Sequence, residues 1–492
     1  MSNQTMIINA VHPEEFRVAI VEGQTLEGFF IETATRGKYV GNLYKAVVTH
    51  VQASLQAAFV NYGVERNGFL PFAEIHPEYY EKEVQEPVRI QDVIHPGQEV
   101  LVQVVKEEVG TKGALLTTYI SLAGRDVVLM PGQSQRGVSR KIEDEAQREQ
   151  LKELVRDLKV PEELGIIIRT AAENRTKREI AKDLNHLVKI WEEIKKQVQE
   201  TPAPGLIYKE QDLAIRVIRD YFNPNIKTIL VDDREVYRRV KEFLHIISPK
   251  QQRVVKLCKE DGPIYAKYNL EEQIEQIFRD KVYLKSGGYL YIAPTEALVA
   301  IDVNSGRTNG NGAVGEMVYK VNMEAASEIP RQLRLRDLGG LIVIDFIDMR
   351  ESRQAREVER RLKEEMKKDK AKITIGRISR FGLLELSRQH LGLNIIRGSF
   401  HQCPMCHGSG MVRSTEATAI HYFRKIWLTL AQKKIASVKA TLSLDVANYL
   451  LNNKRTDIMD LEARYLTTIF IEGSTTLLPH EGNLEFTPKE IV

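Results

Sequence analysis

Residues 297–306 read ALVAIDVNSG and residues 341–349 read LIVIDFIDM, and these two strand-like segments decide the fold of the region around them. Side chains in a strand alternate between faces, so Asp302 and Asn304 share one face at the carboxyl end of the first segment. Asp345 lies late in the second segment. If the helix predicted between them makes the usual right-handed crossover, both acids reach the same edge of one sheet. We therefore expect two carboxylates and an amide oxygen to converge.

The residue types at this edge favour a divalent metal site. A carboxylate within an apolar strand is rarely buried without a partner or a metal. A few oxygen ligands with room for water suit Mg²⁺ or Mn²⁺ and not zinc. Such a site supplies phosphoryl polarisation and a hydroxide for in-line attack on a phosphodiester, so no nucleophilic side chain is needed. The alternative is that the acids cap helices or pair with the arginines at 331, 334, 336 and 350.

Length, charge and cysteine content limit the class of protein. A chain of 492 residues is too long for one hydrophobic core and predicts about three domains. Lys and Arg exceed Asp and Glu by only 70 to 67, so any binding of nucleic acid must be local. Three cysteines cannot form a disulfide framework, and the N-terminus MSNQTMIINAVHPEEF lacks the features of a signal peptide. No apolar stretch is long enough to span a membrane, so we expect a cytoplasmic protein.

Hydrophobic periodicity divides the rest of the chain into modules. N-terminal strand-like segments precede five short strand-like runs within 38–130, which predict a small closed β-barrel. Apolar residues at spacings of three and four then predict a helix that ends at the Pro-rich stretch 201–205. Strand and helix alternate afterwards, an α/β pattern that could complete the N-terminal strands. A hairpin turn at Gly287-Gly288, a helix over 315–338 and a charged helix over 351–370 accompany the two acidic strands.

The predicted barrel carries residues suited to binding single-stranded RNA. Phe59, Tyr62 and Phe69 flank the hairpin FVNYGVERNGFLPF. Neighbouring strands and loops carry four lysines, namely Lys38, Lys45, Lys106 and Lys112. Aromatic platforms with interleaved cations are how barrels of the OB type bind single strands, each stacked base contributing about 1–3 kcal/mol. The alternative is that the aromatics belong to the barrel core, although the turn from Gly63 to Gly68 favours an exposed site for some of them.

Cys403-Pro-Met-Cys406 followed by His407 resembles half of a zinc knuckle. It offers two thiolates where structural Zn²⁺ requires four ligands, and the sequence contains no second pair. His401 or His407 could complete a site within one chain, but the simpler solution is that two chains contribute one pair each. Reduced, unligated thiols are the alternative. Haem attachment and thioredoxin-type redox chemistry both need settings that this sequence does not favour.

Beyond these separate features, the sequence closely resembles the ribonuclease E/G family. The matching strings, in the family's order, are GNLYKAVVTHVQASLQAAFVNYGVERNGFLPFAEI, KGALLTTYISLAG, AIDVNSG, RQLRLRDLGGLIVIDFIDMR, RISRFGLLELSRQ and CPMCHGSG. The resemblance covers essentially the whole chain. It implies an α+β multidomain protein, in which an RNase-H-like layer is split by an inserted OB-fold barrel and followed by a DNase-I-like catalytic α/β domain, a zinc-link and a small C-terminal domain. The implied boundaries are 1–37 and 211–279 for the RNase-H-like parts, 38–125 for the barrel, 126–210 for a 5′-end sensor, 280–399 for the catalytic domain, 400–414 for the zinc-link and 415–492 for the C-terminal domain.

The resemblance also assigns roles to residues. The family's metal ligands fall on Asp302 and Asp345, with Asn304 beside them. Its RNA-binding residues fall on Phe59, Phe69, Lys106 and Lys112, its zinc ligands on Cys403 and Cys406, and its 5′-monophosphate pocket on Gly124, Val128, Arg169 and Thr170. One position departs from the family pattern, because Lys372 stands where a supporting arginine is expected. Lysine keeps the charge but loses the planar fork, so we expect weaker sensing of the 5′ end.

The implied activity is that of an endoribonuclease. It would cleave single-stranded RNA by Mg²⁺-dependent hydrolysis to 5′-phosphate and 3′-hydroxyl ends, in RNA decay and in RNA processing, rRNA processing included. The chain is closest in size to the ribonuclease G branch of the family, and we expect no degradosome scaffold tail, with a homodimer or a homotetramer as the assembly. The alternatives are a non-catalytic RNA-binding protein and a metal-dependent phosphodiesterase of small molecules. The paired acids argue against the first, and the barrel aromatics argue against the second.

Overall fold

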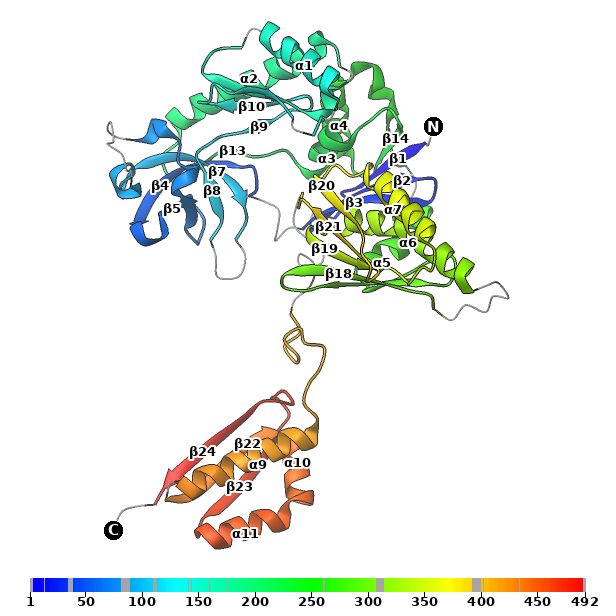
Figure 1. Ribbon diagram of the computed structural model, residues 1–492. Helices are drawn as coiled ribbons and strands as arrows, with labels where there is room; N and C mark the ends of the chain where they lie inside the picture. The colour runs from blue at the N-terminus through cyan, green and yellow to red at the C-terminus, as the bar shows by residue number, and fades with distance from the viewer. Residues whose placement is uncertain are drawn as a thin grey trace. The chain divides into compact units, whose positions relative to one another are not determined.

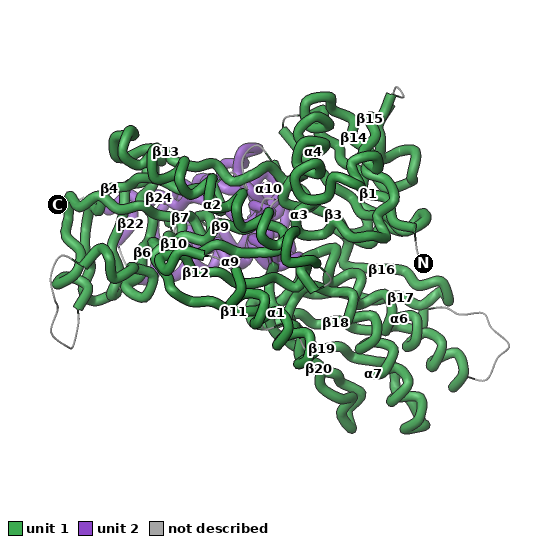
Figure 2. Tube along the Cα trace, turned by 90° about the horizontal axis from the view of Figure 1, so that it is seen from above, with its two compact units in different colours: residues 1–398 green, residues 399–492 purple. Residues whose placement is uncertain are grey.

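The computed structural model divides the chain into two compact units, Met1–Gly398 and Ser399–Val492 (Figure 2). The residues that it describes are 3–12, 14–33, 39–80, 89–108, 113–139, 141–142, 144–158, 160–173, 175–259, 262–306, 314–391, 400, 402–432 and 434–489. None of the helices in these parts of the chain has the length and apolarity needed to cross a bilayer.

The first sheet combines strands from two parts of the sequence that lie far apart. Its five strands lie in the order β15-β14-β1-β2-β3. Their bounds are β1 Gln4–Asn9, β2 Glu15–Glu22, β3 Thr25–Thr33, β14 Ile226–Val231 and β15 Val255–Leu257. Because β14 pairs in parallel with β1, the segment after the Pro-rich stretch completes the N-terminal strands, as the alternation of strand and helix predicted. The helices of this layer are α3 Leu213–Tyr221, α4 Arg234–Ile247 and α5 Leu270–Ile277.

A closed barrel is inserted into this layer, as the five strand-like runs predicted (Figure 1). Its strands are β4 Leu43–Gln52, β5 Ala57–Asn61, β6 Gly68–Pro71, β7 Glu99–Lys106 and β8 Leu115–Thr117, and β13 Gly205–Tyr208 extends it beyond β4. Pairing of β7 with β4 closes the barrel. Gly68 is required at one close approach, because a Cβ atom there would lie 2.4 Å from Leu116 Cδ1.

A four-stranded sheet in the order β11-β12-β10-β9 follows the barrel. Its strands are β9 Leu122–Ala123, β10 Val127–Pro131, β11 Arg136–Val138 and β12 Leu164–Ile168, and its helices are α1 Glu145–Asp157 and α2 Lys177–Glu200. A capping box between Thr176 and Glu179 starts α2. The helix ends at Glu200, directly before the Pro-rich stretch, and buries the apolar face that the sequence predicted.

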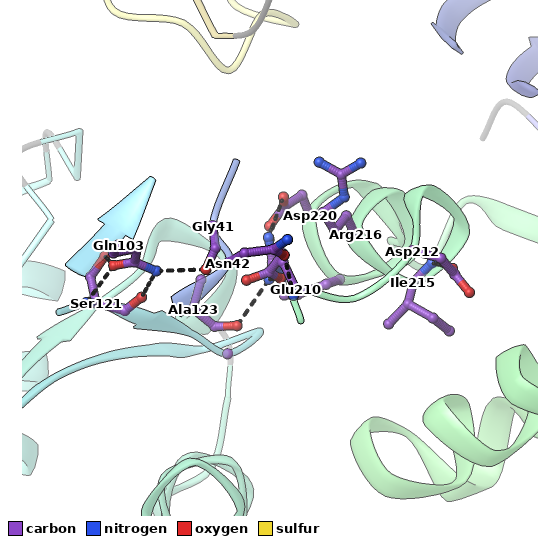
Figure 3. A network of polar contacts seen from close by, with 12 residues as sticks. Gly41, Asn42, Gln103, Ser121, Ala123, Glu210, Asp212, Ile215, Arg216 and Asp220 are labelled. Carbon is purple, nitrogen blue, oxygen red and sulfur yellow. Dashed lines mark hydrogen bonds and ion pairs between the residues drawn. The ribbon is translucent and has the colours of Figure 1, made fainter. Parts of the chain in front are cut away.

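A polar network ties the barrel, this sheet and α3 together (Figure 3). Gln103 of the barrel donates to the carbonyl oxygens of Gly41 and Ser121, at 3.0 Å each. Arg219 of α3 donates to the carbonyl oxygen of Ala123 at 3.1 Å and to Glu210 at 3.0 Å. These contacts satisfy polar groups at the points where the chain passes from one module to the next.

The last sheet of the first unit has the strand order β16-β17-β18-β19-β21-β20. The strands are β16 Lys281–Tyr283, β17 Tyr289–Pro294, β18 Leu298–Asn304, β19 Gly340–Asp345, β20 Ile373–Ile378 and β21 Leu383–Arg388, and the helices are α6 Val314–Arg336 and α7 Ser352–Met366. Strands β18 and β19 are parallel and are connected through α6. Helices α6 and α7 lie on one face of this sheet (Figure 1), and their apolar residues pack against it.

A buried ion-pair network fixes the far end of β21. The Arg388 side chain, only 1% exposed, donates from Nε to Asp369 at 2.8 Å and from Nη1 to Asp337 at 2.9 Å. Nη1 also donates to the carbonyl oxygen of Leu338 at 2.7 Å. Helix α6 ends earlier than the predicted 338 because Asp337 takes a left-handed conformation, with φ of 46°, and joins this network.

The second unit contains a three-stranded sheet in the order β23-β22-β24. Its elements are α9 Thr415–Gln432, β22 Ile435–Ser443, α10 Leu444–Asn453, α11 Arg455–Tyr465, β23 Thr468–Ser474 and β24 Gly482–Pro488. Strand β23 is parallel to β22 and β24 is antiparallel to it. The central strand β22 is the most buried of the three. Its apolar residues and those of the three helices form a hydrophobic core within the second unit.

We expect Arg388→Met to lower the free energy of opening of the last sheet by about 3–5 kcal/mol, because the buried carboxylate of Asp369 and the partly buried one of Asp337 would lose their cation. Hydrogen exchange of the β19 and β21 amides measures this quantity without assuming that the whole chain unfolds in one step. Arg353→Met is the matched control, since Arg353 is 86% exposed and its pair with Glu357 should contribute less than about 0.5 kcal/mol. Equal effects of the two variants would contradict the prediction.

Candidate active site and nucleic-acid interface

Asp302 and Asp345 lie opposite each other on neighbouring parallel strands. On β18, Val299, Ile301 and Val303 are buried, whereas Asp302 and Asn304 point to the open face. Asn304 Nδ2 donates to Asp302 Oδ2 at 2.8 Å, so the amide orients one carboxylate. Strand alternation and the parallel pairing of β18 with β19 thus bring the two acids and the amide together, as the sequence predicted.

A third acid, Asp348, lies beside this pair and was not singled out from the sequence. Partial desolvation raises the pKa of Asp345, and the charges of Asp302 and Asp348 raise it further. A Cβ atom on Gly382 would meet Asp348 Oδ1 at 3.4 Å and Asp345 Oδ1 at 3.9 Å, so both carboxylates face the same turn. The only sign of Asp348 in the sequence was its position three residues after Asp345 in the same motif.

A buried amide holds the segment between these two acids. Asn322 of α6 is fully buried, donates to the carbonyl oxygen of Ile347 at 2.8 Å and accepts from the Ile347 N–H at 3.2 Å. A side chain that satisfies both backbone groups of one residue fixes the backbone at that point. Asp345 and Asp348 flank a clamped residue and are held in place by the core of the sheet.

The alternative that the acids pair with Arg331, Arg334 or Arg336 is not supported. Arg331 pairs with Glu328, Arg334 pairs with Glu27, and Arg336 donates to Gln332 and to backbone carbonyls. Among the described residues, the potential metal-ligating atoms at the open edge are therefore carboxylate oxygens and the oxygen of one amide. The carboxylates repel one another. Such oxygen donors fit a hard divalent cation, and Asp302 and Asp345 would hold it.

The barrel presents two of its predicted aromatic residues outward. Phe59 and Phe69 are directly paired on β5 and β6, with ring centroids 5.9 Å apart, and both are partly exposed. The His50 ring stacks on the Phe59 ring, with centroids 6.4 Å apart, because the two residues are direct partners on β4 and β5; the sequence did not indicate this contact. Tyr62 is only 3% exposed and packs on Tyr44, so the core alternative holds for this residue.

The lysines expected around these rings differ in their environment. Lys106 is exposed at the end of β7. Lys45 forms an ion pair with Glu99 at 3.0 Å, which ties it to the barrel wall. Lys38 and Lys112 lie outside the described residues.

Of the residues expected to bind the 5′ end, Gly124 contacts the guanidinium of Arg169 directly. Its Nη1 donates to the carbonyl oxygen of Gly124 at 2.6 Å, and its Nη2 donates to Asp220 at 2.6 Å. Val128 lies on β10, which is paired with β12, and Thr170 is exposed directly after Arg169. Burial would raise the pKa of Asp220, but Arg219 and Arg169 lower it below its usual value. Arg169 is thus oriented by a carboxylate of α3.

Two further lysines lie near Arg169 and were missed in the sequence. Lys141 Nζ donates to the carbonyl oxygen of Lys370 at 2.5 Å. The Lys370 ammonium lies 4.0 Å from the centroid of the Tyr221 ring. Lys370 reaches solvent, but desolvation by the surrounding protein lowers its pKa to about 8. The charge of Asp220 raises this pKa, whereas the charge of Arg169 lowers it further. Lys372 is exposed two residues further on, where only its backbone carbonyl has a described contact, to the Gln389 N–H at 2.9 Å.

The Cys403 and Cys406 pair lies in a compact turn of the second unit. The Cys403 carbonyl accepts from the His407 N–H at 2.8 Å, and left-handed backbone at His407, Gly408 and Gly410 folds the turn. The N–H groups of Gly410 and Gly408 lower the pKa of the Cys406 thiol, and so does the Cys403 thiol beside it. The His407 ring contacts the His480 ring, and His401 lies outside the described residues. In the described part of the chain, no third Cys, His, Asp or Glu joins this pair in a metal-binding group.

Sequence models of known families match three consecutive parts of the chain. The S1 RNA binding domain matches residues 39–118, which form the barrel. The Ribonuclease E/G family matches residues 121–391, and the RNase E/G thioredoxin-like domain matches residues 402–486. The longest match contains Asp302, Asp345 and the residues around Arg169.

Three relatives extend these matches. The chain is 44% identical over 479 residues to Ribonuclease E of Haemophilus influenzae, which covers 96% of this chain and 51% of that protein. It is 44% identical over 463 residues to Ribonuclease E of Escherichia coli, which covers 93% of this chain and 44% of that protein, so the chain spans about half the length of these two relatives. Ribonuclease G of Escherichia coli is 38% identical over 426 residues, which covers 86% of this chain and 87% of that protein. With a family match over more than half of its length and a relative matched along most of both chains, this protein belongs to the ribonuclease E/G family.

Proposed function

We propose that the protein is a Mg²⁺-dependent endoribonuclease that cleaves single-stranded RNA within the chain, leaving 5′-phosphate and 3′-hydroxyl ends, in RNA processing and decay in the cytoplasm. The observation that carries the proposal is the direct pairing of Asp302 with Asp345 at an open strand end. Membership of the ribonuclease E/G family supports it. A module that only bound RNA would gain nothing from paired carboxylates in the path of a polyanion.

Each residue of the site has a distinct part in this chemistry. A bound Mg²⁺ supplies phosphoryl polarisation and activation of water. Asp302 and Asp345 would hold it, and Asn304 keeps the Asp302 carboxylate in one orientation through its 2.8 Å hydrogen bond. Asn322 anchors the backbone after Asp345, so the carboxylates need not reorganise when a phosphate arrives. The outward rings of Phe59 and Phe69 would stack on bases of the single strand. Lys106 and Lys112 would neutralise its phosphates on the barrel.

The module assignments form part of the proposal. We assign 1–37 and 211–279 to an RNase-H-like layer, 38–125 to the RNA-binding barrel, 126–210 to a 5′-end sensor and 280–399 to a DNase-I-like catalytic domain. The sensor would bind a terminal monophosphate through Gly124, Val128, Arg169, Thr170 and Lys372. We assign 400–414 to a zinc-link and 415–492 to a small C-terminal domain, with Zn²⁺ shared between the Cys403 and Cys406 pairs of two chains.

Asp302→Asn and Asp345→Asn should each reduce cleavage by orders of magnitude, because each removes a charged ligand of the metal. The assay follows an end-labelled, A/U-rich single-stranded oligonucleotide with Mg²⁺ or with EDTA and scores internal cuts. Both variants should still fold and bind RNA. Glu296→Gln is the control, since Glu296 is exposed in the turn that precedes β18, at the other end of the strand from Asp302. Substantial Mg²⁺-dependent cleavage by either aspartate variant would refute the assigned roles.

We expect about one Zn²⁺ per two chains, coordinated by four thiolates from two subunits. Cys403→Ser should release the metal and weaken the dimer. Metal analysis by mass spectrometry and sedimentation velocity measure the two effects, and Cys258→Ser is the control because Cys258 lies in the first unit and is not part of the Cys-Pro-Met-Cys motif. One Zn²⁺ per chain, or an unchanged oligomer in Cys403→Ser, would rule out the shared site.

RNA with a 5′-monophosphate should be cleaved faster than the same RNA with a 5′-hydroxyl, and Arg169→Ala should abolish the difference while basal cleavage persists. A guanidinium offers a fork to phosphate oxygens, and Asp220 already orients it. Lys372→Arg should enlarge the preference by restoring a planar fork. The measurement is the ratio of kcat/KM for the two RNAs, with Arg239→Ala as a control for loss of an ion-paired arginine elsewhere. Equal rates on both RNAs in the unmodified enzyme would show that the pocket does not sense the end.

A further inference from the structure

The open face of the catalytic sheet carries a row of tyrosines beside the acids. Tyr291 pairs directly with Asp302 across β17 and β18, and Tyr289 pairs with Asn304. On the next strand, Tyr283 pairs with Tyr289 and Lys281 pairs with Tyr291. Directly paired residues project from the same face of a sheet, so these four side chains share the face of the catalytic acids. We call Lys281, Tyr283, Tyr289 and Tyr291 the tyrosine platform.

The platform is accessible and has the geometry of a stacking surface. Tyr283 is 73% exposed and Tyr291 is 39% exposed, whereas their neighbours Val282, Leu290 and Ile292 are buried on the opposite face. The Tyr283 and Tyr289 rings lie 6.2 Å apart between centroids. The Lys281 ammonium lies 5.1 Å from the centroid of the Tyr289 ring. Rings and a cation therefore alternate on a surface that continues into the acidic site.

We propose that the tyrosine platform binds unpaired bases of RNA on one side of the scissile phosphate. The proposal rests on the proposed endoribonuclease function and adds a base-binding subsite in the catalytic domain to the one expected on the barrel. Each base stacked on an aromatic side chain strengthens binding by about 5- to 150-fold, whatever the base. Lys281 would neutralise a backbone phosphate next to the acids, where the charges of Asp302 and Asp345 otherwise repel the strand.

Charge and continuity favour RNA over a second copy of the chain as the occupant. An aromatic surface flanked by a lysine on one side and by carboxylates on the other suits a polyanion that approaches a cation-binding site. A stable protein interface usually buries about 800 Å² on each partner with an apolar centre, whereas this row is narrow and interrupted by charge. Cross-strand packing alone would stabilise the hairpin, but it does not require Tyr283 to remain 73% exposed.

A second ring and cation lie on the other side of the acids. Phe381, in the turn between β20 and β21, is 68% exposed, and the Arg380 guanidinium lies 4.7 Å from its ring centroid. The adjacent Gly382 faces Asp345 and Asp348. The acids thus lie between two ring-and-cation surfaces, as expected where a single strand crosses a cleavage site with bases held on both sides of the cut.

The test compares Tyr283→Thr and Tyr291→Thr, singly and combined, with the unmodified enzyme. Threonine keeps the preference for a strand and removes the ring. The KM for a single-stranded oligonucleotide should rise about fivefold or more for each ring lost, with kcat nearly unchanged, and Tyr291→Phe should restore KM. In EDTA, oligonucleotides containing 5-iodouracil should form photo-cross-links that map to Tyr283, Tyr289 or Tyr291.

Matched controls come from α4, where Lys241 lies 5.6 Å from the centroid of the Tyr237 ring. Tyr237→Leu and Lys241→Ser should leave KM unchanged, whereas Lys281→Ser should raise it. Unchanged KM in the combined variant, or no cross-link to the platform, overturns the proposal even if the unmodified enzyme cleaves RNA. A change in oligomeric state with unchanged RNA affinity also overturns it, in favour of a second copy. If the unmodified enzyme does not cleave RNA, the proposed function fails, and the cross-links and binding affinities alone decide on the platform.

Discussion

The in-register parallel pairing of β18 with β19 is the constraint on which the candidate active site depends. Asp302 lies opposite Asp345 only in this register. Because side chains alternate, a slip of one residue would turn one acid into the core and expose its apolar neighbours. The buried residues Ile301 and Ile344, which pack on α6 and α7, therefore fix the position of the acids even though they take no part in the chemistry. Hydrophobic packing on the buried face of the sheet therefore fixes where the carboxylates lie on the open face.

Holding carboxylates together is unfavourable, and the structure offsets this with rigid polar contacts. Asn322 satisfies both backbone groups of Ile347, between Asp345 and Asp348. Arg388 neutralises Asp369 and Asp337 within the same sheet. A buried amide and a buried guanidinium are costly when unpaired, so each specifies one arrangement of the elements that it joins. Desolvation raises the pKa of Asp345 and the charges of Asp302 and Asp348 raise it further, at a strand end that these contacts hold in place.

Local periodicity predicted the parts of the fold that depend on neighbouring residues. It predicted the face of Asp302, the helix from Lys177 to Glu200 and the closed barrel, because alternation and helical spacing follow directly from burial on one side. It did not predict the Asp220 contact of Arg169 or the approach of Lys141 to Lys370, which bring together residues far apart in the chain. Nor did it separate buried Tyr62 from exposed Phe59, since both lie in one short hairpin and only barrel closure decides which ring points inward.

Strand β21 connects the two candidate sites of the first unit, the acids and the region around Arg169. At one end, Leu383 pairs with Asp345, and at the other end Arg388 binds Asp369, directly before Lys370. The strand has six residues, so these points are about 17 Å apart at the usual rise per residue. Lys370 in turn accepts a hydrogen bond from Lys141 through its carbonyl and lies near Arg169. Because a paired strand and a buried ion pair lie between the acids and the lysines, the loop that carries Asp369 and Lys370 is tied to the same sheet as the acids. An RNA that engaged both regions would meet fixed positions, which favours alignment of one particular phosphate over its neighbours.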